Sequence, residues 1–209
     1  MKKALLVILC AALVFALAAC SAKKQNEATT ATSETTSAVT QEATAPKVNY
    51  EPVTNEDGDI LITMPSDFYD EYNPPSDALT EDQKEKGVKA AIVNDDSTLT
   101  YVIDKDKYEE LKKLMYKETG DALNNYKQSQ PYVKNVACKS DFSVINLQVD
   151  REEYSSQMGN FVIIWEAGLN GELYQVFAGV PPEDLSVDVV LSDYETGEVI
   201  DAAHYPNNN

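Results

Sequence analysis

The apolar and polar positions divide the chain into stretches of different character. Residues 4–16 form an unbroken apolar run, residues 21–55 contain almost no large apolar side chain, and apolar residues recur at regular spacing from about residue 58 onward. A stretch without large apolar residues cannot bury enough surface to offset the entropy lost on folding. We therefore predict a disordered Ser/Thr/Ala/Glu-rich stalk over residues 20–57, a folded domain over 58–206 and a disordered tail over 207–209.

Within the folded domain, alternating apolar and polar residues predict strands, and short polar segments between them predict turns. Pro65 ends the first strand, and the following segment, 66–77, is rich in Tyr, Asp and Pro and indicates an irregular loop. The remaining strands form three hairpins. The predicted strands are 60–64, 88–93, 99–103, 133–139, 144–149, 187–191 and 199–205.

Apolar residues spaced three and four positions apart predict helices. A short helix spans 79–86, with Thr80 as its N-cap, and the clearest helix spans 104–127. The segment 151–177 is ambiguous, because its apolar residues repeat at helical spacing while an Asn-Gly pair at 170–171 between two apolar runs is also a hairpin signature. We favour a helix here because the helical spacing persists along the whole segment.

The predicted order of elements, β-α-ββ-α-ββ-α-ββ, describes an α+β fold. Hairpins separated by helices indicate a single domain with one mostly antiparallel sheet and helices packed on one face. The opposite strand faces carry mixed side chains, so we expect them to be solvated or to form a binding surface. Residues on these faces are Lys89, Thr98, Thr100, Asn146, Gln148 and Asp188.

The apolar run at the start of the chain has the features of an export signal. Lys2 and Lys3 precede it, and Ala18 and Ala19 stand directly before Cys20. A positive start, an apolar core and a small-residue cleavage site are the layout of a secretory signal peptide. The run is also too short for a membrane-spanning helix, which needs roughly 20 residues. We therefore predict a signal peptide over residues 1–19, cleaved between Ala19 and Cys20.

The residues Leu17-Ala-Ala-Cys20 resemble the lipobox of bacterial lipoproteins. The resemblance implies that the Cys20 thiol is alkylated with a diacylglycerol and that Cys20 becomes the first residue of the mature protein. Two acyl chains, such as palmitate, give stable anchoring, at about 0.8 kcal/mol per buried CH₂. We therefore expect a lipid anchor at the extracytoplasmic face of the cell membrane. The alternative is an ordinary secretory signal that is cut nearby and leaves a free thiol.

The mature chain is strongly acidic. Removing residues 1–19 takes away two lysines, which changes the formal net charge from −18 to −20. Proteins that bind nucleic acid neutralise phosphates with Lys and Arg, so this charge argues against a nucleic-acid partner. The negative charge is explained most simply by solubility. The alternative is a functional role, in which the charge attracts cations or basic partners. Lipidation of Cys20 leaves Cys138 alone in the mature chain, without a partner for an intramolecular disulfide.

No motif in the sequence indicates catalysis, a metal site or a cofactor. There is one histidine, His204, in the last predicted strand, and the chain has no Gly-x-Ser-x-Gly, Gly-x-x-x-x-Gly-Lys-Ser/Thr or Gly-x-Gly-x-x-Gly sequence. The segment 55–59 superficially matches an EF-hand loop. Aligning Gly58 with the loop glycine, however, places Val53 and Met64 at the first and last positions, and neither supplies a carboxylate.

The candidate binding patch lies in the predicted loop after the first strand. Tyr69 and Tyr72 occur in a polar, proline-containing segment that does not imply burial, and Asp70 and Glu71 lie between them. Exposed aromatic residues are enriched where proteins recognise partners. Packing of the tyrosines on the domain's own surface is the alternative interpretation.

Four segments resemble a group of extracytoplasmic lipoproteins from Gram-positive anaerobes of the Firmicutes and Clostridia type. They are 62–68 (ITMPSDF), 87–94 (GVKAAIVN), 174–177 (YQVF) and 196–200 (TGEVI). The matching segments are structural in character, and the group is uncharacterised. The resemblance therefore implies the location and a single shared domain, and it identifies no functional residue.

Two hypotheses for the function follow. The first is a membrane-anchored, non-catalytic binding or interaction module whose ligand is an extracellular protein, a wall component or a small molecule. The second is a small hydrolase that acts on cell-wall or sugar substrates through carboxylates. Paired carboxylates for such hydrolysis lie about 5–10 Å apart in a cleft, and the 35 acidic residues leave the choice of a pair open.

Overall fold

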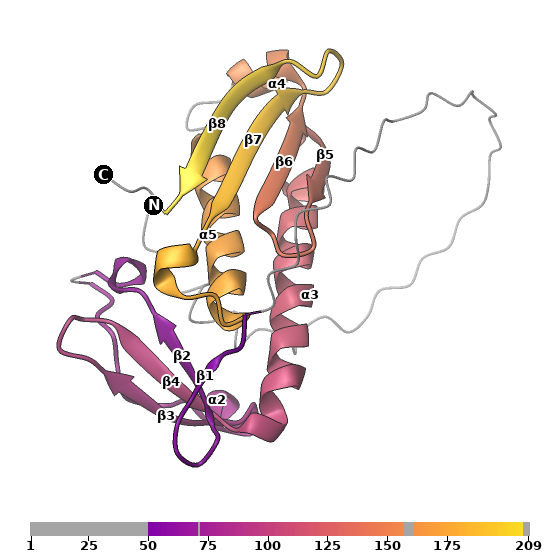
Figure 1. Cartoon of the computed structure of the whole chain (residues 1–209). Helices are drawn as coiled ribbons and strands as arrows, with labels where there is room; N and C mark the ends of the chain where they lie inside the picture. The colour runs from indigo at the N-terminus through magenta and orange to yellow at the C-terminus, as the bar shows by residue number, and fades with distance from the viewer. Residues whose placement is uncertain (1–49, 71, 157–160, 207–209) are drawn as a thin grey trace. The chain divides into compact units, whose positions relative to one another are not determined.

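The computed structural model describes residues 50–70, 72–156 and 161–206 (Figure 1). They belong to one compact unit that begins at Tyr50. The structure therefore includes residues 50–57, which we had assigned to the stalk, in the folded unit. The reason is that Val53 and Thr54 form a short strand against Leu61 and Ile60. The predicted signal peptide, Cys20 and the tail at 207–209 lie outside the described residues.

The chain alternates strands and helices along its length (Figure 1). The strands are β1 (Val53–Thr54), β2 (Ile60–Met64), β3 (Val88–Val93), β4 (Leu99–Ile103), β5 (Val133–Cys138), β6 (Val144–Val149), β7 (Val187–Asp193) and β8 (Val199–Tyr205). The helices are α2 (Glu81–Glu85), α3 (Lys105–Ser129), α4 (Arg151–Ser156) and α5 (Phe161–Phe177), with 3-10 turns η1 (Ser66–Phe68) and η2 (Pro182–Asp184). None of the helices in the described residues is long and apolar enough to span a membrane.

Local signals in the sequence explain where the helices begin. Thr80 caps α2 through a capping box, in which its hydroxyl accepts from Gln83 N and the Gln83 side chain accepts from Thr80 N. Asp104 caps α3 by accepting from Asp106 N. The described parts of the ambiguous segment form two helices, α4 and α5, so the preference for helix over a hairpin at 170–171 is confirmed, while the single helix over 151–177 is not what the structure describes.

The α+β class is confirmed, but the strands form two sheets instead of one. In the N-terminal sheet the strand order is β1-β2-β4-β3, and all pairs are antiparallel. In the C-terminal sheet the order is β5-β6-β7-β8, and its central pair, β6 and β7, is parallel. The chain returns from the end of β6 to the start of β7 through α4 and α5, and a parallel pair requires a crossover of this kind.

The main core lies between the C-terminal sheet and the helices α3 and α5. Residues that alternate along β6 and β7 point to this side and are fully buried, namely Ile145, Leu147, Val149, Val187, Val189 and Leu191. Each such side chain contributes about 1.5–3 kcal/mol relative to an exposed one. Two glycines allow α5 to approach the sheet. A Cβ at Gly171 would lie 2.9 Å from a methyl of Val187, and a Cβ at Gly168 would lie 2.2 Å from the Tyr205 ring.

The two sheets are connected through the long helices. The Tyr108 hydroxyl on α3 donates a buried hydrogen bond of 2.9 Å to the Phe177 carbonyl at the end of α5. α5 also contacts β2, and Figure 1 shows the N-terminal sheet beside these ends of the helices. Five of the six side chains of β2 and β4 that point to this side are buried, and Tyr101 is the partly exposed one; the buried five are Ile60, Ile62, Met64, Leu99 and Ile103. One face of each sheet is therefore covered by helices.

Candidate functional site

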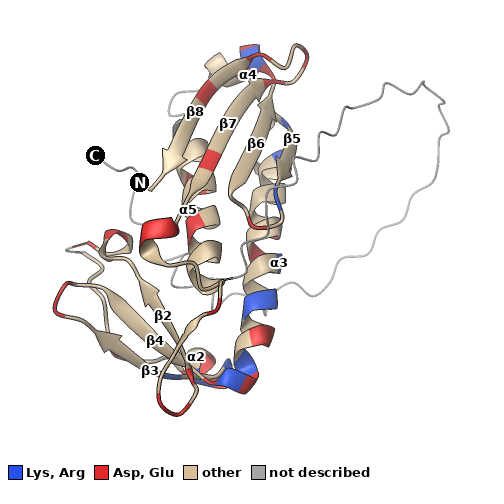
Figure 2. Cartoon of the chain, in the orientation of Figure 1, with Lys and Arg blue, Asp and Glu red and all other residues tan. Residues whose placement is uncertain are grey.

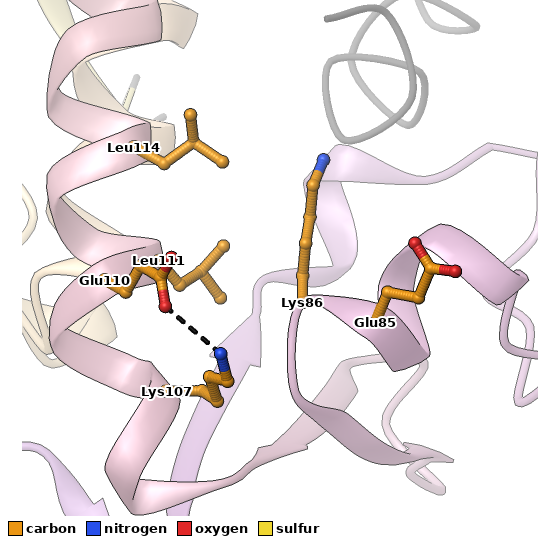
Figure 3. Close-up of a pocket in the computed structure, with 6 residues that line it drawn as sticks. All are labelled: Glu85, Lys86, Lys107, Glu110, Leu111 and Leu114. Atoms are coloured by element: carbon orange, nitrogen blue, oxygen red, sulfur yellow. Dashed lines mark hydrogen bonds and ion pairs between the residues drawn. The ribbon is translucent and has the colours of Figure 1, made fainter.

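A small pocket lies between the C-terminal end of α2 and the first half of α3 (Figure 3). It has a volume of about 100 Å³, and it is lined by Glu85, Lys86, Lys107, Glu110, Leu111 and Leu114. Lys107 Nζ and Glu110 Oε2 form an ion pair of 3.3 Å at its edge. Pockets that enclose organic ligands usually measure about 300–1,000 Å³. This pocket is therefore too small to enclose a ligand of ordinary size.

Two acidic side chains close to Lys86 have a buried oxygen without a hydrogen bond. The Oε2 atom of Glu118 has no partner among the described residues, and burial raises the pKa of its carboxyl. Asp82 Oδ2 lies 2.9 Å from Lys86 Nζ, an ion pair by distance but without hydrogen-bond alignment. The lysine partly offsets the effect of burial on Glu118. The positive charge of Lys86 thus partly neutralises the carboxylates of Asp82 and Glu118. Among the described residues, the structure gives neither a nucleophile nor a histidine beside them.

The predicted patch of tyrosines and acids lies on the loop after β2. Tyr72 is 79% exposed and Tyr69 is half-buried. The carboxylate of Asp70 accepts hydrogen bonds of 2.8 Å from the backbone N–H groups of Tyr72 and Asn73, so it stabilises a turn. Glu71 lies outside the described residues. Of the two tyrosines, Tyr72 therefore has the larger exposed fraction.

Glu172 is the buried acid with the most altered titration. It lies on α5, it is 7% exposed, and its pKa is raised to about 7. Burial is the main cause, the negative charge of Asp67 raises the pKa further, and His204 lowers it in part. Sequence reasoning did not select Glu172, because its position on a helix gives no sign that the turn at η1 and the end of β8 come close to it.

His204 itself is an exposed strand residue, as its position predicted. Its Nδ1 lies 2.8 Å from Asp188 Oδ1 on the neighbouring strand, and both side chains are more than half exposed. An exposed pair of this kind contributes at most about 1 kcal/mol. Within the described residues, no three His, Cys, Asp or Glu side chains gather as a metal site would require.

Both sheets leave their other face without a covering helix, and the two faces differ in character. The open face of the C-terminal sheet is mixed: Asn146 and Gln148 are partly exposed on β6 and Asp188 is exposed on β7, but the same side also carries Val190 and Val199. The three polar residues are among those predicted to lie on a solvated or binding face. The Asn135 amide donates to the Gln148 side chain at 2.8 Å, so part of this face is satisfied by its own neighbours.

The open face of the N-terminal sheet is mostly apolar, and we call it the outer face. It consists of Val53, Leu61, Thr63, Ala90, Ile92, Thr100 and Val102. Val53, Leu61, Val102 and Ala90 form one row across all four strands, because they are paired in register. None of the seven side chains is buried, and Val53 and Ile92 are 68% and 48% exposed. Within the described residues, no helix covers this face.

Acidic turns border the outer face at both ends of its strands (Figure 2). Glu56 and Asp57 lie in the turn between β1 and β2, and Asp95 and Asp96 lie in the turn between β3 and β4. Asp96 accepts hydrogen bonds from the hydroxyl and the N–H of Thr98, which lower its pKa and keep it ionised. The segment 55–59, which resembled a calcium loop, is one of these turns, with Gly58 at a φ of 81°.

The sequence predicted part of this surface and missed the rest. Thr100 was assigned to the exposed side of its strand, and the structure places it on the outer face. Lys89 lies at the border, where it forms ion pairs with Asp59 and Asp104 at 2.7 and 3.2 Å. The exposure of Leu61 and Val102 could not be predicted from the sequence, because a strand with apolar residues on both of its sides is typical of full burial.

Comparison with known proteins gives no match to a family model, to a curated protein or to a solved structure.

Proposed function

We propose that this chain is an extracytoplasmic lipoprotein, anchored to the cell membrane through Cys20, whose folded part is a non-catalytic binding module. The anchor rests on the sequence Leu17-Ala-Ala-Cys20 after a short apolar run. A stalk of residues 20–49, rich in Ser, Thr and Ala, would let the folded unit reorient near the membrane. The resemblance to lipoproteins of Gram-positive anaerobes supports the same location.

The observation that supports a binding function is the outer face of the N-terminal sheet. Single exposed apolar residues are ordinary on protein surfaces, but contiguous apolar patches mark sites of interaction. Here the apolar side chains form a row across four strands, while the opposite side of β2 is buried and faces the helices. A flat surface of this kind suits a macromolecular partner better than a small solute, which binds in a concave site.

The anchor predicts a change of compartment in the variant Cys20→Ala. Without the thiol no diacylglycerol can be attached, so we expect the protein to leave the membrane fraction. Cell fractionation followed by immunoblotting measures this, and Cys138→Ala is the matched control that keeps the anchor. Sedimentation of Cys20→Ala with membranes to the same extent as the wild type would show that the lipid-anchor proposal is wrong.

The binding function is tested by capturing partners of the full chain on the surface of the cells that make it. After cross-linking, mass spectrometry should recover a specific partner with the wild type and lose it with Leu61→Lys/Val102→Lys, in which two charges enter the outer face. The variant Asn146→Lys/Gln148→Lys places two charges on the other sheet and is the control. Recovery of no specific partner, together with hydrolysis of wall fragments by the purified protein, would overturn the proposal.

Glu172 supports the second candidate function, a carboxylate-dependent hydrolase. A carboxyl with a pKa of about 7 beside Asp67 has the properties of a general acid. The pocket in Figure 3, however, is lined by α2 and α3, whereas Glu172 lies on α5. The structure therefore does not bring the two features together. If the chain is a hydrolase of this type, Glu172→Gln should abolish hydrolysis of wall fragments.

A further inference from the structure

We infer that the partner of the outer face is an extended, cationic polypeptide segment that adds to the free edge of β3. This inference rests on the proposed binding function and specifies its partner. It depends on three features of the N-terminal sheet: the edge of β3, the apolar row beside it, and the acidic turn between β3 and β4.

β3 is the last strand of its sheet and pairs on one side only, with β4. Within the described part of the chain, no loop donates a backbone hydrogen bond to its residues or accepts one from them. Such an edge can pair with an extended segment of another chain, whose backbone then continues the sheet. A register shift at Val88/Ala90 and the ion-paired Lys89 protect the first part of the strand. The open part of the edge is therefore Ala90–Val93.

The side chains of this edge match a segment with alternating apolar residues. Ile92 points to the outer face and is 48% exposed, while Val93 alternates to the other side of the sheet and is also exposed. In a paired strand, every second residue lies on the same face, so apolar residues of the partner would lie next to Ile92 and Ala90. Contact between them would cover apolar surface that is now in water.

The charge selects a cationic segment. The turn with Asp95 and Asp96 follows directly after Val93 and presents carboxylates to a segment that runs along the open part of β3, whereas Glu56 and Asp57 lie in the turn between β1 and β2, on the other side of the sheet. Lys89, the lysine of β3 itself, is already paired with two carboxylates, and Lys105 lies beside the turn between β1 and β2. A segment with basic residues beside its apolar ones would be attracted to the Val93 end of β3, and an acidic segment would be repelled there. Pairing of two copies of this chain is also disfavoured by charge, because each mature chain carries a formal net charge of −20.

The inference is tested with synthetic peptides and the full-length protein in detergent. The first probe is a fluorescent peptide of alternating Lys and Val, about seven residues long, which matches a typical strand. The second replaces Lys with Glu. The third keeps the lysines but has Pro in place of the central Val, which removes a backbone donor and prevents strand pairing. We expect the Lys-Val peptide to bind at least about tenfold more tightly than either of the others, as measured by fluorescence anisotropy.

Matched variants locate the site. Ile92→Lys should weaken binding of the Lys-Val peptide at least about tenfold, whereas Val199→Lys should leave it unchanged. Val199 is the fair comparison, because it is an exposed valine, 58% accessible, on an edge strand of the other sheet, and the added charge is the same. Equal binding of the Lys-Val and proline-containing peptides would mean that charge alone attracts them, and would overturn the inference.

Two further outcomes would also overturn it. If the Lys-Val peptide does not bind, while capture on cells still recovers a partner that depends on Leu61 and Val102, the proposed function stands and the inferred partner class is wrong. If Ile92→Lys changes the sedimentation of the protein alone from dimer to monomer, the edge is occupied by a second copy.

Discussion

Replacing Gly168 with alanine is expected to lower the free energy of unfolding by about 2–3 kcal/mol. The new methyl group would lie 2.2 Å from Cδ2 of the Tyr205 ring, far inside contact distance. The backbone of α5 cannot retreat without disturbing the buried residues on β6 and β7. Relief would therefore require the Tyr205 ring, which is buried at the end of β8, to leave its place, and loss of that burial also costs about 1.5–3 kcal/mol.

Gly120 gives the matched comparison, with an expected effect of opposite sign. It lies within α3, and a Cβ added there would meet nothing within 4 Å. Alanine at an open position in a helix interior is more favourable than glycine by about 0.5–1 kcal/mol. Urea denaturation of both variants, followed by circular dichroism, measures the two changes. An increase in stability for Gly168→Ala similar to that of Gly120→Ala would contradict the packing of α5 against β8.

Glu172→Gln is expected to remove a pH dependence of stability between about pH 5 and pH 8. The folded state raises the pKa of Glu172 from 4.5 to about 7, so the folded protein holds this proton more tightly than the unfolded chain. The stabilising contribution is complete below the unfolded pKa, and it is lost as the pH rises through 7. Since one unit of pKa corresponds to about 1.4 kcal/mol, the loss is at most about 3 kcal/mol.

The measurement is urea denaturation of the wild type and the variant at both pH values. Glu172→Gln should gain stability relative to the wild type at pH 8 and show little gain at pH 5, because glutamine stays neutral at both. Glu195→Gln, at an exposed position in the turn after β7, is the control and should show no such change. The same relative stability of Glu172→Gln and wild type at pH 5 and pH 8 would mean that Glu172 is not buried as described.

Most helices and strands could be predicted from the sequence, but the pairing of the strands into two sheets could not. The hairpin of β3 and β4 was predicted to the residue, because alternation and a polar turn are both local signals. The helix α5 was predicted because its apolar spacing extended across the Asn-Gly pair. Which strands become neighbours depends on contacts between distant residues. The pairing of β2 with β4, the parallel pairing of β6 with β7 and the short strand β1 therefore left no local pattern to read.

The candidate site, too, depends on contacts between residues that are distant in the sequence, so it could be predicted only in part. The polar surroundings of Tyr69 and Tyr72 indicate exposure, and the structure shows Tyr72 exposed and Tyr69 half-buried, while their role in binding stays a prediction. The outer face depends on four strands that are aligned in register, so its apolar row from Val53 to Ala90 exists only in the folded sheet. Glu172 was one acid among 35, and its environment depends on η1 and β8, which are remote from it in sequence.

Site-specific photo-crosslinking on intact cells tests the proposed binding function most directly. A photoreactive phenylalanine derivative in place of Ile92 would report on the outer face and the edge of β3, and the same residue in place of Lys113 would report on the exposed side of α3. The account predicts one discrete crosslinked product, containing a second protein, from position 92 and none from position 113. No product from position 92, or the same products from both positions, would contradict a binding function at this face.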